Sequence, residues 1–219
     1  MDRRSFNLLL GSATGLLFLS PTFAFAAPTA DQIADEVQKY YDKTKTFKAA
    51  FKQRYEMKFP NKVKESDGKV VFQKPGKMSW RYTNGNRVVS DGKLIRVYEK
   101  ESKQMYEQPM NKSYYPAALS FLIGGGSLKK TFDLKQLDAE KMKFKGGYVL
   151  LGEPKEPTPA YQNVLLYVDA KTFQVRRILL LDAQGNRNRF DFLTPAVNAK
   201  VLPMEFSYQA PPGTKVIRP

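Results

Sequence analysis

The 219-residue sequence contains no cysteine and no histidine. Without cysteine there are no disulfides and no thiolate ligands, and without histidine there is no imidazole to bind a metal. Catalysis by Ser-His-Asp or Cys-His groups is excluded for the same reason. The missing cysteine leaves the redox compartment open, because a cysteine-free chain tolerates any.

Acidic residues are scarce, with 21 Asp and Glu against 36 Lys and Arg, so the formal net charge is +15. This excess favours nucleic acid, an anionic membrane or an acidic partner. The basic residues are spread along the chain, so the charge is equally consistent with a role in solubility alone. No recognisable nucleic-acid-binding motif accompanies them, and we expect no nucleic-acid partner.

Long apolar runs are confined to the N-terminus. Arg3 and Arg4 precede an apolar stretch at 8–19, and Ala24-Phe25-Ala26 has the pattern of a signal-peptidase site. We therefore predict a signal peptide at 1–26, exported by the Sec or the twin-arginine route, with an uncleaved anchor as the alternative. No later segment approaches the ~20 apolar residues of a membrane span. The remainder, 27–219, is predicted to be one domain.

A helix is predicted at 29–44. Thr29 and Gln32 form a capping-box pattern at its start. The apolar residues that follow fall on one helical face. They are Ile33, Val37, Tyr40 and Tyr41.

Strand patterns dominate the rest of the chain. Phe47 to Phe59 alternates between apolar and polar residues, which predicts a long strand of a curved sheet or barrel. Val70 to Lys100 predicts four short strands, because Asn84-Gly85 and Asp91-Gly92 are strong hairpin signals. In Val164–Val168 both faces are apolar.

Further strands are expected in the second half, and we count about eleven in all. They are Gln104–Gln108, Met142–Leu151 with a turn at Gly146-Gly147, Phe173–Asp182, Arg187–Val197 and Leu202–Tyr208. A short apolar helix is expected between Pro116 and Gly124. With so little helix between strands, the chain is predicted to be mainly β and antiparallel.

Large apolar side chains gather on the predicted sheet. They are Phe51, Tyr55, Met57, Phe72, Met78, Trp80 and Tyr82. Any one of them is consistent with an ordinary core. A barrel of about eleven strands is wider than its own side chains fill, so the set predicts an apolar cavity for a ligand.

Catalytic chemistry finds little support. Asp67, Asp91, Asp133 and Asp191 have the pattern of turn or exposed-strand residues, although two carboxylates can still converge in the fold. The glycines at 124–126 lack the context of a phosphate-binding loop. We expect neither an enzyme nor a bound cofactor.

Several motifs occur in the order seen in the LolA family of outer-membrane lipoprotein carriers, which the chain resembles over 27–219. They are Phe47-x-Ala-x-Phe51-x-Gln53, Gly68-x-Val-x-Phe72-x-Lys-Pro75-x-x-Met-x-Trp80, Ser90-Asp91-Gly92-Lys93 and Phe206-x-Tyr-x-x-Pro-Pro-Gly213.

The resemblance implies an incomplete antiparallel β-barrel with short helices forming a lid over the cavity. It implies a monomeric periplasmic chaperone that takes acylated lipoproteins from an inner-membrane ABC-type releasing complex to an outer-membrane acceptor. Phe121 and Leu122 would also line the cavity. Lys74 stands where the family has an arginine that latches the lid, and it offers a point charge in place of a two-pronged donor. Gly124, Gly125 and Gly126 are expected to form the hinge.

Three alternatives remain open. The first is an acceptor like the related LolB, which is a lipoprotein, although no cysteine follows the signal here. The second is a sensor that binds lipid or lipoprotein without delivering it. The third is a small periplasmic hydrolase with converging carboxylates.

Overall fold

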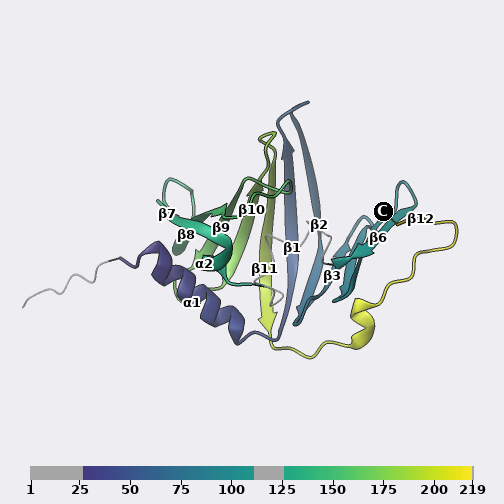
Figure 1. The fold of residues 1–219 in the computed structure, drawn as a ribbon, viewed down its shortest axis with the longest axis horizontal. Helices are drawn as coiled ribbons and strands as arrows, with labels where there is room; N and C mark the ends of the chain where they lie inside the picture. The colour runs from purple at the N-terminus through teal and green to yellow at the C-terminus, as the bar shows by residue number, and fades with distance from the viewer. Residues whose placement is uncertain (1–26, 111–125, 219) are drawn as a thin grey trace, which may run out of the picture.

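The structure is a computed structural model that describes residues 27–110 and 126–218. Within these ranges twelve strands form one open sheet, in the order β12-β6-β5-β4-β3-β2-β1-β11-β10-β9-β8-β7 (Figure 1). The mainly β fold is confirmed, with one strand more than we counted. The expected helix after Pro116 lies outside the described residues.

Helix α1 spans Ala30–Asp42 and confirms the predicted N-terminal helix. Its capping box is formed, with the Thr29 amide donating to Gln32 Oε1 at 2.8 Å and the Gln32 amide to Thr29 Oγ1 at 3.2 Å. The buried face carries Ile33, Ala34, Val37 and Tyr41. This apolar face packs on the sheet.

The long hairpin of β1 (Thr46–Met57) and β2 (Lys62–Gln73) occupies the middle of the sheet. β1 confirms the predicted long strand. β2 begins eight residues before Val70, where our predicted meander began. Those residues are mostly polar and show no alternating pattern. They form a strand because their backbone pairs along the whole of β1, from Met57 with Lys62 to Thr46 with Gln73.

The predicted meander is confirmed in β3 (Lys77–Tyr82), β4 (Arg87–Asp91) and β5 (Leu94–Glu99), followed by β6 (Gln104–Pro109). Gly85 and Gly92 sit at the tight turns with φ of 94° and 96°, a conformation that favours glycine. Four antiparallel strands therefore extend the sheet on one side of the hairpin.

The other side of the sheet begins after the short helix α2 (Leu128–Thr131). It contains β7 (Phe132–Leu137), β8 (Gly147–Pro154), β9 (Asn163–Asp169), β10 (Val175–Leu181) and β11 (Arg187–Val197). β11 pairs with β1, so the β1–β2 hairpin lies between the two halves of the sheet. The expectation of a strand from Met142 was wrong, because the Met142 and Phe144 amides donate to the carbonyls of Asp138 and Ala139 in a compact turn.

The C-terminal segment crosses the outer face of the meander. The expected strand at Leu202–Tyr208 was wrong: Pro203–Phe206 form the 3-10 helix η3, which contacts β3 and β4. The alternating apolar residues of this segment do not share one buried face, since Phe206 is buried whereas Leu202 and Met204 are exposed. The chain then ends in β12 (Lys215–Ile217), parallel to β6.

Two apolar clusters lie on opposite faces of the sheet. The inner cluster joins α1 to the inner faces of β1–β5 and β8–β11, and the outer one is centred on Val149, Leu165, Tyr167 and Leu179. Val164 and Leu166 belong to the inner cluster, so β9 is buried on both faces, as its sequence predicted. No helix in the described ranges is long and apolar enough to cross a membrane.

Candidate functional site

Aromatic rings from distant strands meet on the inner face of the sheet. The Trp80 ring centroid lies 4.9 Å from that of Phe51 on β1 and 5.2 Å from that of Phe190 on β11. β3 and β11 are separated by β2 and β1, which in a flat sheet would place them about 14 Å apart. The sheet must therefore curl around this aromatic cluster, which also includes Phe47, Phe72 and Phe192.

Trp80 is the centre of the cluster. It is 0% exposed, and its indole Nε1 has no hydrogen-bond partner among residues 27–110 and 126–218. A buried donor without an acceptor typically costs about 1–3 kcal/mol. The inner face thus combines an apolar surface with one unsatisfied donor, a group that a carbonyl oxygen of a ligand would satisfy.

The predicted cavity residues fall into two groups. Phe51, Phe72, Met78 and Trp80 are at most 1% exposed and belong to the packed inner cluster. A ligand reaches these four side chains only if the rings move apart. Tyr82 packs against the cluster, and Tyr55 and Met57 continue the same face of β1 with partial exposure.

The proposed lid lies largely outside the described residues, which exclude Phe121, Leu122, Gly124 and Gly125. Gly126 is described and exposed. It precedes Ser127, the N-cap residue of α2. The hinge stays a prediction.

A hollow of about 400 Å³ adjoins the aromatic cluster on the inner face. Its apolar part comes from Tyr55, Tyr82, Val88 and Val97. Its polar part includes Lys64, Gln53 and Asn188, the last two joined by a 2.8 Å hydrogen bond between Gln53 Nε2 and Asn188 Oδ1. We did not predict this polar edge, because Lys64 and Asn188 come from separate strands that only the folded sheet brings together.

Lys74 connects the two sides of the molecule. From the turn between β2 and β3, its ammonium group donates to the carbonyl of Tyr41 in the last turn of α1. Burial lowers the pKa of Lys74, opposed by the charge of Asp42. The Tyr41 hydroxyl in turn accepts from the Val175 amide at 3.2 Å, and burial raises the pKa of Tyr41. The predicted latch residue thus holds the end of α1.

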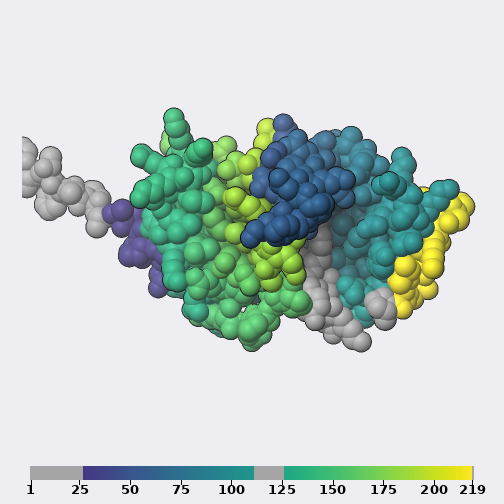
Figure 2. All heavy atoms as spheres, turned by 90° about the horizontal axis from the view of Figure 1, so that it is seen from above, coloured from purple at the N-terminus to yellow at the C-terminus, as the bar shows by residue number. Residues whose placement is uncertain are grey.

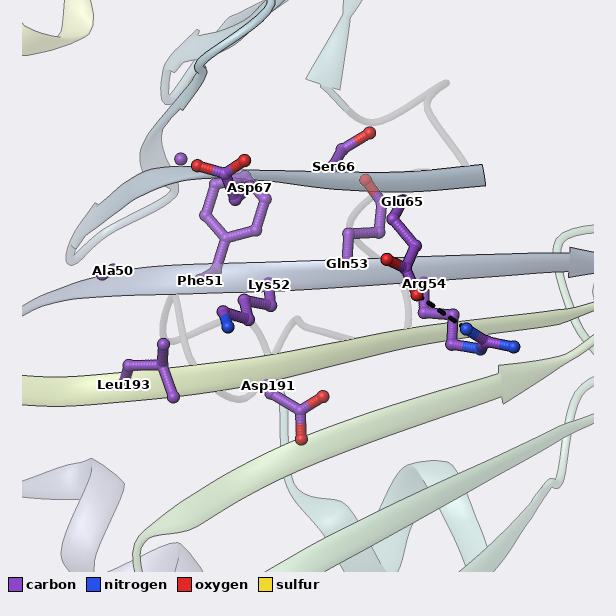
Figure 3. A pocket seen from close by; sticks show the side chains of 11 residues that line it. Ala50, Phe51, Lys52, Gln53, Arg54, Glu65, Ser66, Asp67, Asp191 and Leu193 are labelled. Atoms are coloured by element: carbon purple, nitrogen blue, oxygen red, sulfur yellow. Dashed lines mark hydrogen bonds and ion pairs between the residues drawn. The ribbon is translucent and has the colours of Figure 1, made fainter. Parts of the chain in front are cut away.

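The outer face carries a charged hollow of about 530 Å³ over β1, β2 and β11 (Figure 3). Lys52 is paired in register with Asp67 on one side and Asp191 on the other. Arg54 Nη1 lies 2.6 Å from Glu65 Oε1, and Arg189 Nε lies 2.6 Å from Asp191 Oδ2. Two of the four carboxylates that we considered for catalysis therefore share a hollow.

Each of those four carboxylates has a hydrogen-bond or ion-pair partner, which accounts for its presence by a structural role. Asp67 accepts from the Thr83 hydroxyl, and Asp191 from Arg177 and Arg189. Asp91 accepts from the amides of its own turn, and Asp133 lies 3.6 Å from Lys155 Nζ. In the part of the chain that the structure describes, these four carboxylates therefore take part in turns, hydrogen bonds and ion pairs.

Comparison with known protein families gives one match over most of the domain. The family described as outer membrane lipoprotein carrier protein LolA matches residues 42–209. An outer-membrane lipoprotein carrier protein of Bordetella avium is 27% identical over 210 residues, covering 94% of this chain and 95% of that protein. One of Methylibium petroleiphilum is 29% identical over 199 residues, covering 89% and 93%.

Two solved structures are similar to the chain to different degrees. An uncharacterised conserved protein of Thermus thermophilus has a TM-score of 0.53 at 14% identity, covering 87% of this chain and 99% of that one. A LolA superfamily protein of Nitrosomonas europaea gives 0.46 at 15% identity, covering 83% and 99%. The first of these likenesses supports the curled open sheet described above.

Proposed function

The chain belongs to the LolA family of outer membrane lipoprotein carrier proteins, and from this we propose that it is a periplasmic chaperone that shields the acyl chains of lipoproteins. In this proposal the signal peptide at 1–26 directs export, and residues 27–219 form the carrier domain. The chaperone receives its cargo from an inner-membrane ABC-type releasing complex. It passes the cargo to an outer-membrane acceptor.

The observation that carries the proposal is the inner face itself. Apolar side chains from β1–β5 and β8–β11 form one continuous cluster, which opens into the hollow beside Tyr55 and Tyr82. Trp80 Nε1, which has no partner in the described part of the chain, suits the ester or amide carbonyl of an acylated group. These features together match a ligand with long apolar chains and carbonyl groups near one end.

The energetics require shielding in transit. Burial of one CH₂ group is worth ~0.8 kcal/mol, so a 16-carbon chain in water costs on the order of 12 kcal/mol. The carrier must nevertheless release its cargo. We propose that the rings of Phe51, Phe72 and Trp80 close on one another in the empty protein and separate when acyl chains enter. The free energy lost by parting them makes binding weak enough for transfer.

Lys74 has a defined part in this cycle. It ties α1 to the β2–β3 turn, so breaking its bond to Tyr41 frees the helix from the open half of the sheet. Phe121 and Leu122 complete the cavity in the proposal, and the glycines at 124–126 supply the hinge.

Fluorescence of Trp80, the only tryptophan, tests the proposal directly. Addition of a triacylated lipopeptide is expected to change its emission saturably, because the indole exchanges phenylalanine contacts for acyl chains. The matched control is the same peptide without acyl chains, which should leave the spectrum unchanged. An emission spectrum indifferent to the acylated peptide would place Trp80 in permanent core and contradict the proposal.

Transfer distinguishes a carrier from a sensor. Both bind lipoprotein, but only a carrier delivers it to acceptor-containing membranes. Protein loaded with labelled lipoprotein should lose its label to such membranes and retain it with membranes that lack the acceptor. Retention in both cases would favour the sensor.

A further inference from the structure

The paired ends of β1 and β2, with the turn between them, form an arm at residues 54–66 that rises above the rest of the sheet in Figure 1. Figure 2 looks down on this arm. The Lys58 amide donates to Asn186 Oδ1 at 3.0 Å, which ties the arm to the turn between β10 and β11. This bond holds the projecting arm in place relative to the sheet.

Its tip exposes an aromatic ring to water. Phe59 is 81% exposed, the highest value among the large apolar side chains that the structure describes. Val63, four residues later on β2, is 44% exposed. Neither position contributes to either apolar cluster. Folding therefore gives no reason for a phenylalanine at this place.

Lysines flank the ring on both sides in the chain. Lys58 Nζ lies 6.0 Å from the centroid of the Phe59 ring, and Lys62 and Lys64 follow the turn. The acids of the arm are already engaged: Glu56 lies 2.7 Å from Arg54 and 3.8 Å from Arg187, and Glu65 lies 2.6 Å from Arg54. Among the ion pairs of the described residues, none involves these three lysines.

We propose that this arm docks the protein onto an anionic phospholipid bilayer. The Phe59 ring enters the boundary between headgroups and acyl chains, and Lys58, Lys62 and Lys64 bind lipid phosphates while their stems lie along the apolar surface. An aromatic residue at the headgroup level with lysines beside it is the composition that such an interface selects.

The shape of the arm favours a bilayer over a protein partner. A stable protein interface buries roughly 800 Å² on each side, and lysine is depleted from its centre. The arm instead offers one projecting ring and one valine, with lysines close on either side. A fluid surface of lipids accommodates this small wedge without a complementary pocket.

Docking by the arm also orients the molecule. Tyr55 and Lys64, both on the arm, line the inner hollow, so the hollow comes to lie near the bilayer surface. This consequence rests on the proposed function, whereas the docking itself does not require cargo. Vesicle binding by empty protein and cargo transfer are therefore separate measurements.

The test is sedimentation of cargo-free protein with vesicles of phosphatidylethanolamine and phosphatidylglycerol, compared with phosphatidylcholine vesicles. We expect binding to the anionic vesicles that weakens as salt is raised. Phe59→Ser should reduce the partition coefficient about tenfold. Replacing Lys58, Lys62 and Lys64 together with glutamine should reduce it about a hundredfold.

The matched control is Met204→Ser in η3. Met204 is 73% exposed, nearly as much as Phe59, but its neighbour is Glu205, and η3 lies against β3 and β4. This variant should bind vesicles like the parent. Thermal melting checks that each variant is folded. All the substituted residues are exposed, so we expect each variant to fold.

Three outcomes overturn the proposal. One is equal binding of the parent and Phe59→Ser. The second is binding that ignores lipid charge and salt. The third is absent vesicle binding by the parent together with loss of cargo pickup in Phe59→Ser, which assigns the arm to a protein partner instead. A failure of the fluorescence test with intact vesicle binding would leave the docking proposal standing.

Discussion

β9 and the first part of β2 belong to the same sheet and differ in almost every other respect. Five successive residues of β9, Val164–Val168, are buried. Of the eight residues Lys62–Lys69 in β2, six are exposed, and Ser66 and Gly68 are half-buried. The difference lies in what covers the strands. The inner cluster with α1 lies on one face of β9 and the turn at 138–146 on the other, whereas the arm end of β2 has neither.

The comparison teaches that one sheet serves two purposes. On one side of the hairpin, apolar clusters cover both faces around β9, with Val149 of β8 and Leu179 of β10 in the outer one. The arm and the inner hollow have surfaces that folding leaves unused. For the function proposed above, this division allows the ligand-facing part to change while the packing around β9 is kept.

The largest expected effect compares β9 with the arm by the same change, valine to alanine, at two positions. Val164→Ala removes a fully buried side chain and should lower the free energy of unfolding by about 2–3 kcal/mol, from lost burial and the cavity left behind. Val63→Ala, at a 44% exposed position on the arm, should cost less than about 0.5 kcal/mol. Urea denaturation measures both. Equal costs would mean that the arm is as integral to the fold as β9.

A smaller effect concerns the connection between the two sides. Lys74→Met removes the bond to the Tyr41 carbonyl and should destabilise the protein by about 1 kcal/mol. Amide hydrogen exchange should rise in the last turn of α1 more than in β9. Lys39→Met is the control, since its partner Glu36 is exposed and on the same helix, and it should leave exchange unchanged. A uniform rise across α1 and β9 would show global destabilisation in place of a local connection.

The smallest effect is a dependence on pH at the far edge of the sheet. Hydrogen bonding by Arg218 lowers the pKa of Glu107 on β6, against the effect of burial, and Arg96 adds a second bond. Because the folded pKa lies below the unfolded value, this stabilisation is present above about pH 4.5 and is lost as pH falls through the folded pKa. The protection of the β12 amides, measured as the ratio of the unstructured to the observed exchange rate at each pH, should therefore fall in acid. In Glu107→Gln that acid-induced loss of protection should be absent, and its persistence would point to another group.

Local signals predicted much of the fold. The capping box of Thr29 and Gln32 marked the start of α1, and the glycines at 85 and 92 marked two hairpins, because each signal is satisfied by neighbours in the chain. The failures occurred where partners are distant. The polar start of β2 has no strand pattern of its own and becomes a strand by pairing with β1, whereas Leu202–Tyr208 resembles a strand but finds no neighbour to pair with.

The candidate site was predictable only as a set of residue types. The apolar alternation of β1 and β3 marked Phe51 and Trp80 as large side chains on one face of a sheet. It did not indicate that they would pack on Phe190 and Phe192 from β11, because that contact depends on how strongly the sheet curls. The polar edge formed by Gln53, Lys64 and Asn188 carried no signal, since its members come from three strands.

The sequence by itself determined the strand-rich class, the helix at the start of the domain, the turns and the double-sided burial of β9, because these follow from local backbone preferences and the spacing of apolar residues. Only the tertiary structure decided which rings meet around Trp80, that Lys74 reaches the end of α1 and that Phe59 is left in water. Those outcomes depend on long-range strand pairing and on the curl of the sheet, and neither is encoded in any short stretch of the chain.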